Sequence, residues 1–113
     1  MTELARVEAE QRGSACLVRA HGEVDISNAQ ELLAAIESAM PNGAHQLVLD
    51  LTDVSYLDSA GVSLVLRLAR RLKGRRQEVS VVAPEGSSVR AVLEVAGVPK
   101  VVPVLERPAG DSR

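Results

Sequence analysis

The chain has 113 residues and a mass of 12.0 kDa, which is the size of one domain. Hydrophobic residues make up 46% of it and charged residues 25%, a balance that excludes a disordered chain. The 13 Lys and Arg residues against 15 Asp and Glu leave a net charge of −2, which gives no electrostatic basis for direct binding to nucleic acid. Tyr56 is the only aromatic residue, so the core must be aliphatic, and recognition of bases by aromatic stacking is disfavoured.

The cysteine and histidine content predicts no metal site and no cofactor. Cys16 is the only cysteine, so no internal disulfide or cysteine-based zinc site can form. His21 and His45 are far apart and lack the spacing of metal ligands. No apolar run approaches the roughly 20 residues of a membrane span, and residues 1–12 do not resemble a secretory signal. We therefore expect a cytoplasmic protein without a membrane span.

The first part of the chain predicts two strands and a helix. Residues 4–10 alternate between apolar and charged, as in a half-exposed edge strand, and residues 15–20 are expected to form the second strand of a hairpin. Residues 22–25 then lead into a helix. Ser27 is expected to cap it, with Gln30 completing a capping box. The buried face of this helix is expected to consist of Ala29, Leu32, Leu33, Ile36 and Met40.

The middle of the chain predicts a strand over residues 46–51, a loop over residues 52–58 and a helix over residues 59–73. The strand alternates in polarity, so its two faces should have different environments. Leu47, Leu49 and Leu51 are expected to face the helices, and Gln46 and Asp50 to face the opposite side.

The last third predicts a strand, a helix and a short strand. The fourth strand is expected over residues 79–83, and either Ser87 or Ser88 is expected to cap the third helix. Gly97 suits the position after that helix, where a left-handed backbone is common. Residues 101–104 predict a short edge strand.

The element order is therefore ββαβαβαβ, which defines an α/β fold. Three successive β-α-β crossovers require a mostly parallel, five-stranded sheet with right-handed connections. If the strands are arranged in sequential order, the helices lie mainly on one face. We expect one domain over residues 1–106, followed by a flexible C-terminal tail over residues 107–113.

The run Asp58-Ser59-Ala60-Gly61 lies where a loop enters a helix, and it has two interpretations. Asp58 or Ser59 could simply cap the helix, because both residue types are favoured caps. Alternatively, the Ser59 hydroxyl is a site of phosphorylation. A phosphate at that position would meet free backbone N–H groups and the positive end of the helix dipole.

These residues carry a resemblance to a known family. Residues 47–51, the segment 52–57 and the Asp-Ser-Ala-Gly run at residues 58–61 resemble the anti-sigma factor antagonists built on the STAS domain. Residues 22–25 (Gly-Glu-Val-Asp) are similar to the family's second motif, and residues 97–99 to its late Gly-aliphatic turn. The resemblance covers about residues 4–104.

The resemblance implies a regulator that is not an enzyme. Such proteins bind an anti-sigma factor, often a serine-protein kinase, in their unphosphorylated form. The kinase then phosphorylates the serine of the motif, here Ser59, and a phosphatase resets it. Asp25 and Asp58 would flank the acceptor at the contact surface. The expected partner-binding residues are Gly22, Glu23, Asp25, Tyr56, Asp58, Ser59, Ala60 and Gly61.

Several alternatives stay open. Some relatives are unphosphorylated scaffolds in stress-signalling assemblies or accessory subunits of membrane transporters.

Asp50 ends a strand as a response-regulator phosphoacceptor does, but the first strand lacks the acidic pair that would hold Mg²⁺. No catalytic set has recognisable spacing, so no catalytic residues are expected. Tyr56 could anchor a partner or close over the core edge. The basic residues 70–76 could be a solvated helix end or a docking patch for an acidic surface.

Overall fold

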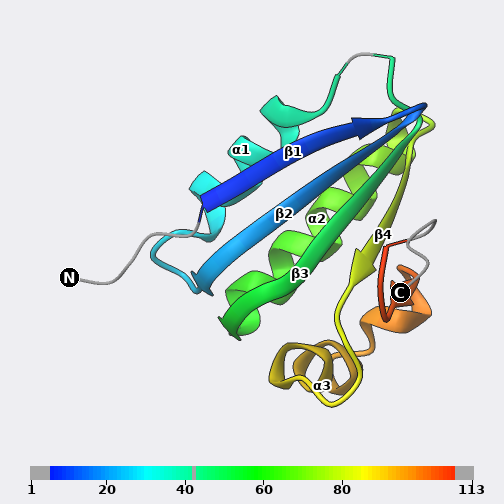
Figure 1. Cartoon of the computed structure of the whole chain (residues 1–113). Helices are drawn as coiled ribbons and strands as arrows, with labels where there is room; N and C mark the ends of the chain where they lie inside the picture. Colours follow the sequence, from blue (N-terminus) through cyan, green and yellow to red (C-terminus); the bar gives the residue numbers. More distant parts are fainter. Residues whose placement is uncertain (1–5, 42, 109–113) are drawn as a thin grey trace.

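A computed structural model describes residues 6–41 and 43–108. Figure 1 shows the elements in chain order: β1 (Arg6–Arg12), β2 (Ala15–Val24), α1 (Ala29–Ala39), β3 (Gln46–Leu57), α2 (Ser59–Gly74), β4 (Glu78–Val82), α3 (Ser88–Val95), the 3-10 helix η1 (Val98–Lys100) and β5 (Val104–Leu105). The strands form one sheet in sequential order. β1 pairs antiparallel to β2, and the other neighbours are parallel. The predicted α/β class and element order are confirmed, with a mixed sheet.

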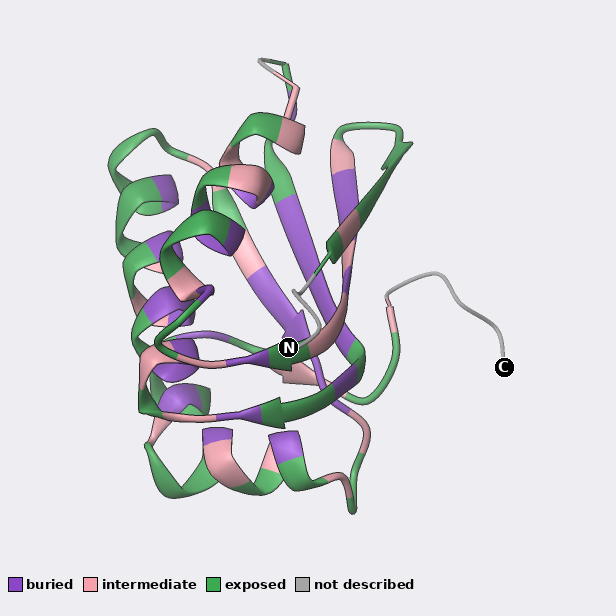
Figure 2. Ribbon diagram, turned by 90° about the vertical axis from the view of Figure 1, so that its left-hand side faces the viewer, coloured by how far each residue is buried: buried purple, intermediate pink, exposed green. Residues whose placement is uncertain are grey.

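The main core lies between the sheet and the helices. Leu47, Leu49 and Leu51 of β3 belong to it, together with buried residues of all three α-helices. Figure 2 shows the buried residues on the inner sides of the helices and along the central strands. Asp50 lies on the other face, where Arg19 contacts it, and Gln46 is exposed. The predicted division of this strand into two faces is therefore confirmed for the three leucines and for Asp50.

The opposite face of the sheet carries a much smaller apolar cluster. Leu17, Val48 and Val82 are buried there, and the half-buried Leu105 of β5 packs against them. No described helix contributes to this cluster. Leu105 of the edge strand β5 thus adds apolar surface to a face that the helices leave open.

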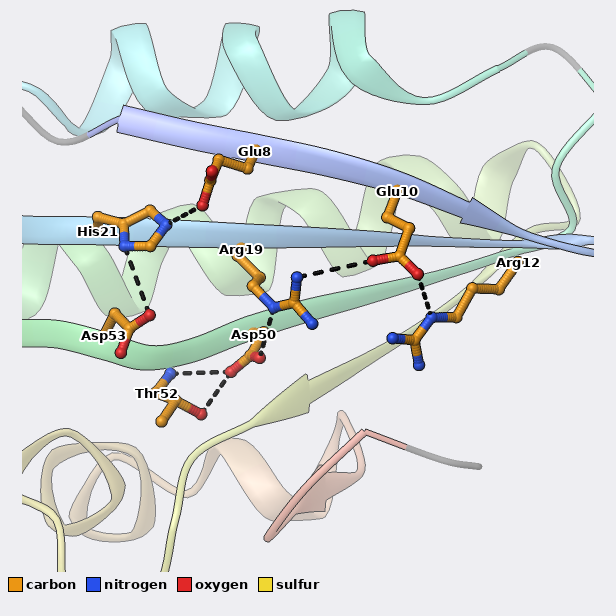
Figure 3. Close-up of polar contacts among 8 residues, drawn as sticks. All are labelled: Glu8, Glu10, Arg12, Arg19, His21, Asp50, Thr52 and Asp53. Carbon is orange, nitrogen blue, oxygen red and sulfur yellow. Dashed lines mark hydrogen bonds and ion pairs between the residues drawn. The ribbon is translucent and has the colours of Figure 1, made fainter. Parts of the chain in front are cut away.

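A polar network occupies the rest of this open face and joins β1, β2 and β3 (Figure 3). His21 Nε2 lies 2.6 Å from Glu8 Oε1, and its Nδ1 lies 3.4 Å from Asp53 Oδ2. Arg19 lies 3.7 Å from carboxylate oxygens of both Glu10 and Asp50. These contacts tie the exposed edge strand β1 to β2 and, through His21 and Arg19 of β2, to β3.

Two bonds hold the buried carboxylate of Asp50 in place. Its Oδ1 accepts hydrogen bonds from the Thr52 backbone N–H at 2.9 Å and from the Thr52 hydroxyl at 2.5 Å. Its Oδ2 faces Arg19. Asp50 therefore lies within the open-face network, where its partners are Arg19 and Thr52, unlike a phosphoacceptor that needs an acidic pair beside it.

The predicted loop over residues 52–58 is wrong, because β3 continues as a strand to Leu57. Its partner β2 likewise runs on to Val24, so residues 22–24 are strand and not turn. The two strands pair as far as Val24 opposite Leu57, with register irregularities after Arg19 and Gly22. Beyond Leu51 the buried residues are Val54 and Leu57, three apart, and this break in the alternation concealed the strand.

The start of α1 also differs from the prediction. The helix begins at Ala29 with Asn28 before it, and Ser27 is not the cap. The Asp25 carboxylate instead accepts hydrogen bonds from the backbone N–H and hydroxyl of Ser27. The Asn28 amide donates to the Glu23 carbonyl at 2.7 Å and accepts from the Asp25 N–H at 3.0 Å. Local bonds of Asp25 and Asn28 therefore replace the expected capping box.

The C-terminal segment contains a helical turn that the sequence did not predict. After the left-handed Gly97 (φ 78°), the 3-10 helix η1 turns Val98 and then Val102 into the core. The last strand consequently starts at Val104 and not at residue 101. It is at the edge of the sheet, as expected. Residues 109–113 of the expected tail lie outside the described residues.

The two faces of the sheet should contribute unequally to stability. Leu49→Ala is expected to lower the free energy of unfolding by about 2–5 kcal/mol, because it leaves a cavity at a fully buried position. Leu105→Ala should cost less than about 1.5 kcal/mol, because that side chain is only half-buried over a small cluster. Chemical denaturation measures both values. Equal losses would contradict the view that the helix-covered face holds the main core.

Candidate functional site

The candidate site forms where β2 and β3 end side by side and α2 begins (Figure 1). Val24 pairs with Leu57, and the Asp58 N–H donates to the Val24 carbonyl at 3.3 Å. Asp25 and Asp58 each follow the last residue of one of these two strands. Because parallel strands bring their carboxyl ends to one edge of a sheet, the two predicted motifs meet there.

Asp58 is the cap of α2. Its Oδ1 accepts hydrogen bonds from the backbone N–H groups of Ala60, at 2.9 Å, and Gly61, at 3.2 Å. The expectation that a phosphate on Ser59 would find those N–H groups free is therefore wrong, because Asp58 already occupies them.

Ser59 is the first residue of α2, and it is exposed. Its hydroxyl has no hydrogen-bond partner among the described residues. The capping role predicted for either residue thus belongs to Asp58. The Ser59 hydroxyl is left accessible at the positive end of a helix dipole.

Gly61 lies beneath the site and is buried. A Cβ atom at this position would lie 2.3 Å from Leu57 Cδ1, 2.8 Å from Leu57 Cγ and 3.3 Å from Val24 Cγ1. Only a residue without a side chain lets the first turn of α2 approach the ends of β2 and β3 this closely. Gly61 therefore positions Ser59 rather than presenting a contact surface of its own.

The end of β2 supplies the acidic part of the site. Gly22 has a left-handed backbone (φ 98°), next to the register irregularity of β2. Glu23 is exposed and pairs across the sheet with Tyr56. The hydrogen bonds from the hydroxyl and N–H of Ser27 hold the pKa of the Asp25 carboxyl below its ordinary value. Asp25 is consequently ionised at neutral pH.

Tyr56 is 50% exposed at the end of β3. It does not close over the core, which leaves the ring available to a partner. Glu23, Asp25, Tyr56, Asp58, Ser59 and Ala60 thus come together at one edge of the molecule, with Gly61 buried beneath them and Gly22 farther down the strand.

Two grooves meet at Ser59. One, of about 460 Å³, lies between α1 and α2 and includes Ile26, Leu33 and Leu64. The other, of about 520 Å³, lies between α2 and α3, and Val62 and Val95 are among its apolar residues. We call them the α1–α2 groove and the α2–α3 groove. Asp58 and Arg67 also line the α1–α2 groove, so Ser59 lies between a mixed groove and a mainly apolar one.

Ile26 and Val95 are exposed apolar residues that the sequence reasoning missed. Ile26 is 85% exposed and Val95 89% exposed, and each lines one of the grooves beside Ser59. The sequence does contain a signal for Ile26. It is an apolar residue between the polar Asp25 and Ser27, and it lies outside the apolar stripe of the helix that follows. Val95 gives a similar signal, because it falls off the Val89–Leu93 face of its own helix.

Other features of the described part of the chain concern metal binding, membrane-spanning helices and the basic residues. Within residues 6–41 and 43–108, no three His, Cys, Asp or Glu side chains are placed to hold a metal ion. None of the helices described here has both the length and the apolar character needed to cross a membrane. The basic residues 70–76 lie at the opposite end of α2 from Ser59, so they are not part of this site.

Comparison with known sequences identifies relatives over most of the described residues. The family model described as Mlab, STAS domain matches residues 7–105. The chain is 34% identical over 90 residues to BtrV of Bordetella bronchiseptica, which is named as a candidate anti-sigma factor antagonist. That match covers 80% of this chain and 74% of BtrV.

Solved structures share the same fold. An anti-sigma factor antagonist from Mycobacterium paratuberculosis superposes with a TM-score of 0.81 at 24% identity, covering 95% of this chain and 92% of that one. The Bacillus protein SpoIIAA in its unphosphorylated form has a TM-score of 0.69 at 23% identity, covering 88% and 87% of the two chains. Its phosphorylated form has a TM-score of 0.63 at 22% identity, covering 88% and 90%.

Gly61 and Gly74 provide a matched test of the close packing under the site. Gly61→Ala is expected to lower the free energy of unfolding by about 1–2 kcal/mol, since overpacking against Leu57 outweighs the better helix propensity of alanine. Gly74→Ala, at the other end of α2, meets nothing within 4 Å and should be neutral or stabilise by up to about 1 kcal/mol. Thermal and denaturant unfolding report both changes. An equal effect of the two substitutions would refute the close approach at Gly61.

Proposed function

The chain belongs to the STAS domain family, and from this premise we propose that it is an anti-sigma factor antagonist switched off by phosphorylation of Ser59. The observation that carries this proposal is the exposed, unbonded Ser59 hydroxyl between two grooves that apolar residues partly line, at the edge where β2 and β3 end. The relative at 34% identity, BtrV, supports the same assignment. The action of such a protein is binding, and no catalytic step is assigned to it.

The unphosphorylated surface is suited to a protein partner. Its centre is uncharged at Ser59 and Ala60, and the exposed Ile26 and Val95 flank it in the two grooves. Apolar side chains at the centre of a contact surface, with charged residues at its rim, are typical of protein interfaces. Glu23 and Asp25 supply an acidic rim on the β2 side. The proposed partner is an anti-sigma factor that is also a serine-protein kinase, so one surface serves as both docking site and substrate.

Phosphorylation would change this surface without unfolding the domain. A phosphate adds about −1.5 to −2 charge at neutral pH. It would stand beside the Asp58 carboxylate, which holds the N–H groups of Ala60 and Gly61. Repulsion between the two anions is offset by the helix dipole, so the fold should keep its stability. A bound partner would instead bury that charge against apolar surface, at a cost of several kcal/mol.

The switch is reversible in this proposal. A phosphatase removes the phosphate from the exposed Ser59 and restores the uncharged surface. SpoIIAA, which shares this fold, has been solved in both unphosphorylated and phosphorylated forms, and this supports a fold that accommodates both states.

Substitutions at Ser59 test the switch. Ser59→Ala should bind the anti-sigma factor constitutively, and kinase treatment with ATP should add no phosphate to it. Ser59→Asp should bind at least about tenfold more weakly, because one carboxylate only partly reproduces the charge of a phosphate. Calorimetry gives the affinities, and mass spectrometry after incubation with host extract and ATP locates the phosphate.

Ser88 is the matched control for these substitutions. It is the exposed first residue of α3 and follows the capping Ser87, just as Ser59 follows Asp58. Ser88→Asp should leave the affinity within about twofold of the unmodified chain, since the residue lies outside both grooves. If Ser59 gains no phosphate and Ser59→Asp binds as tightly as Ser59→Ala, the switch fails. That outcome would favour an unphosphorylated scaffold or an accessory subunit of a transport complex.

Ile26 tests the contact surface independently of phosphorylation. Ile26→Glu is expected to weaken binding of the anti-sigma factor at least about tenfold, because it places a charge at an exposed apolar contact beside Ser59. Ala34→Glu, on the exposed side of α1 and outside the groove, is the control and should bind normally. Both substitutions should unfold at the temperature of the parent chain. Normal binding by Ile26→Glu would remove the α1–α2 groove from the interface.

A further inference from the structure

The second half of α2 and the turn after it concentrate positive charge. Residues 67–76 contain six cations, namely Arg67, Arg70, Arg71, Lys73, Arg75 and Arg76, and residues 59–77 contain no acid. Six of the chain's 13 cations are therefore in this segment. The rest of the chain contains seven cations and 15 acids, which give it a net charge of −8. The charge of the molecule is strongly divided even though its net value is only −2.

Local structure explains only part of this concentration. A helix dipole favours cations in the last turn, which accounts for Arg71 and Lys73. Arg71 also pairs with Glu37 of α1 at 2.6 Å. Arg67 and Arg70 lie before the last turn. Of the six cations, only Arg71 has a hydrogen bond or ion pair through its side chain within residues 6–41 and 43–108. The other five are exposed and have no such partner there; of these, Arg67 lines the α1–α2 groove beside Ser59, and Arg70 and Lys73 lie farther along α2.

A groove runs beside this cluster. It has a volume of about 670 Å³ and lies between the second half of α2, the start of β4 and the segment 101–103 that leads into β5. Its apolar residues include Leu66, Ala69, Val79 and Val101, and we call it the α2–β5 groove. Val101 is 67% exposed, whereas the neighbouring valines Val98 and Val102 are buried in the core.

The groove combines an apolar floor with a cationic side. Arg70 and Lys73 line it from α2, and Glu78 is the one acid among its lining residues. Neither cation has an internal partner in the described part of the chain. A ligand that satisfies both features must present anionic groups to Arg70 and Lys73 and an apolar group to Val101.

We propose that the α2–β5 groove is a second docking surface, and that it binds an acidic protein segment in which carboxylates flank an apolar residue. The surface is separate from the Ser59 site. Arg70 and Lys73 follow Ser59 by 11 and 14 positions, which places them about 16–21 Å farther along the helix axis. The two surfaces can therefore be occupied at the same time, and this proposal does not depend on the phosphorylation switch.

An acidic protein segment fits the groove better than other anions do. Phosphates of nucleic acid or lipid headgroups would meet Arg70 and Lys73 but would leave the apolar floor at Val101 unused. The residues outside 67–76 carry a net charge of −8, and this negative charge also opposes close approach of an extended polyanion. A short peptide needs only the local positive field of the groove.

Nuclear magnetic resonance titration of the ¹⁵N-labelled full chain tests the proposal. The probe is a short synthetic peptide in which pairs of Glu flank a Leu, at low and at physiological salt. We expect shifts at Ala69, Arg70, Lys73 and Val101 and none at Ser59 and Ala60. Matched peptides with Gln for Glu or Ser for Leu should bind at least about fivefold more weakly, and added salt should weaken binding of the Glu peptide.

Charge-reversal variants separate the groove from the overall charge. The double substitution Arg70→Glu with Lys73→Glu should weaken peptide binding at least about tenfold. Arg6→Glu with Arg107→Glu makes the same change in net charge at exposed positions outside the groove and should stay within about twofold. Val101→Asp, at an exposed position, should also weaken binding. Amide spectra of every variant verify that the fold is retained.

Three results would overturn the proposal. The peptide could fail to bind, or it could bind the groove variant and the parent chain equally. Alternatively, a DNA duplex or vesicles containing an anionic lipid could bind more tightly than the peptide and lose that binding in the same variant. This last result would assign the cluster to phosphate recognition and not to a protein segment.

Discussion

The parallel pairing of β2 with β3 determines where every part of the candidate site lies. The two strands stay hydrogen-bonded past the end of β4, through two register irregularities, until Val24 lies opposite Leu57. Both chains then leave the sheet at the same edge. Asp25 leads into α1 and Asp58 into α2, so two motifs that are 33 positions apart in sequence become neighbours. A pairing that ended at Leu51 would leave both motifs on separate loops without a fixed relation.

The contacts around this edge fix α2 as well as the strands. Asp58 donates its N–H to Val24 and caps the helix with its carboxylate, so one residue joins the sheet end to the helix start. Gly61 then lets the first turn pack directly on Leu57 and Val24. Because Asp58 caps the helix, the Ser59 hydroxyl makes no hydrogen bond that stabilises the fold within the described residues. A regulated residue needs this separation, because a group that holds the fold together cannot be modified without damaging it.

Local patterns predicted most of the fold but not the extent of its central strands. The order of elements, the buried leucines of β3 and the start of α2 at Ser59 follow from periodicity and from capping preferences. The continuation of β3 to Leu57 could not be predicted, because buried residues three apart suggest neither a regular strand nor a helix. Ser27 matched a capping box, yet the bonds between Asp25 and Asn28 decide that region. For the site, the motif residues were candidates from the sequence, and their role stays a prediction. The exposed Ile26 and Val95 belong to no motif. The sequence marks them only as apolar residues off the buried face of a helix, and the structure places them beside Ser59.

We propose above all that a charge added at Ser59 releases the partner while leaving the fold intact. The most direct measurement is a calorimetric titration of the anti-sigma factor with the chain fully phosphorylated at Ser59, set beside the unmodified chain and a thermal melt of each. We predict an affinity at least about two orders of magnitude lower for the phosphorylated chain, with an unchanged unfolding temperature. Equal affinities for the two forms, or a loss of binding that accompanies a loss of folded structure, would contradict it.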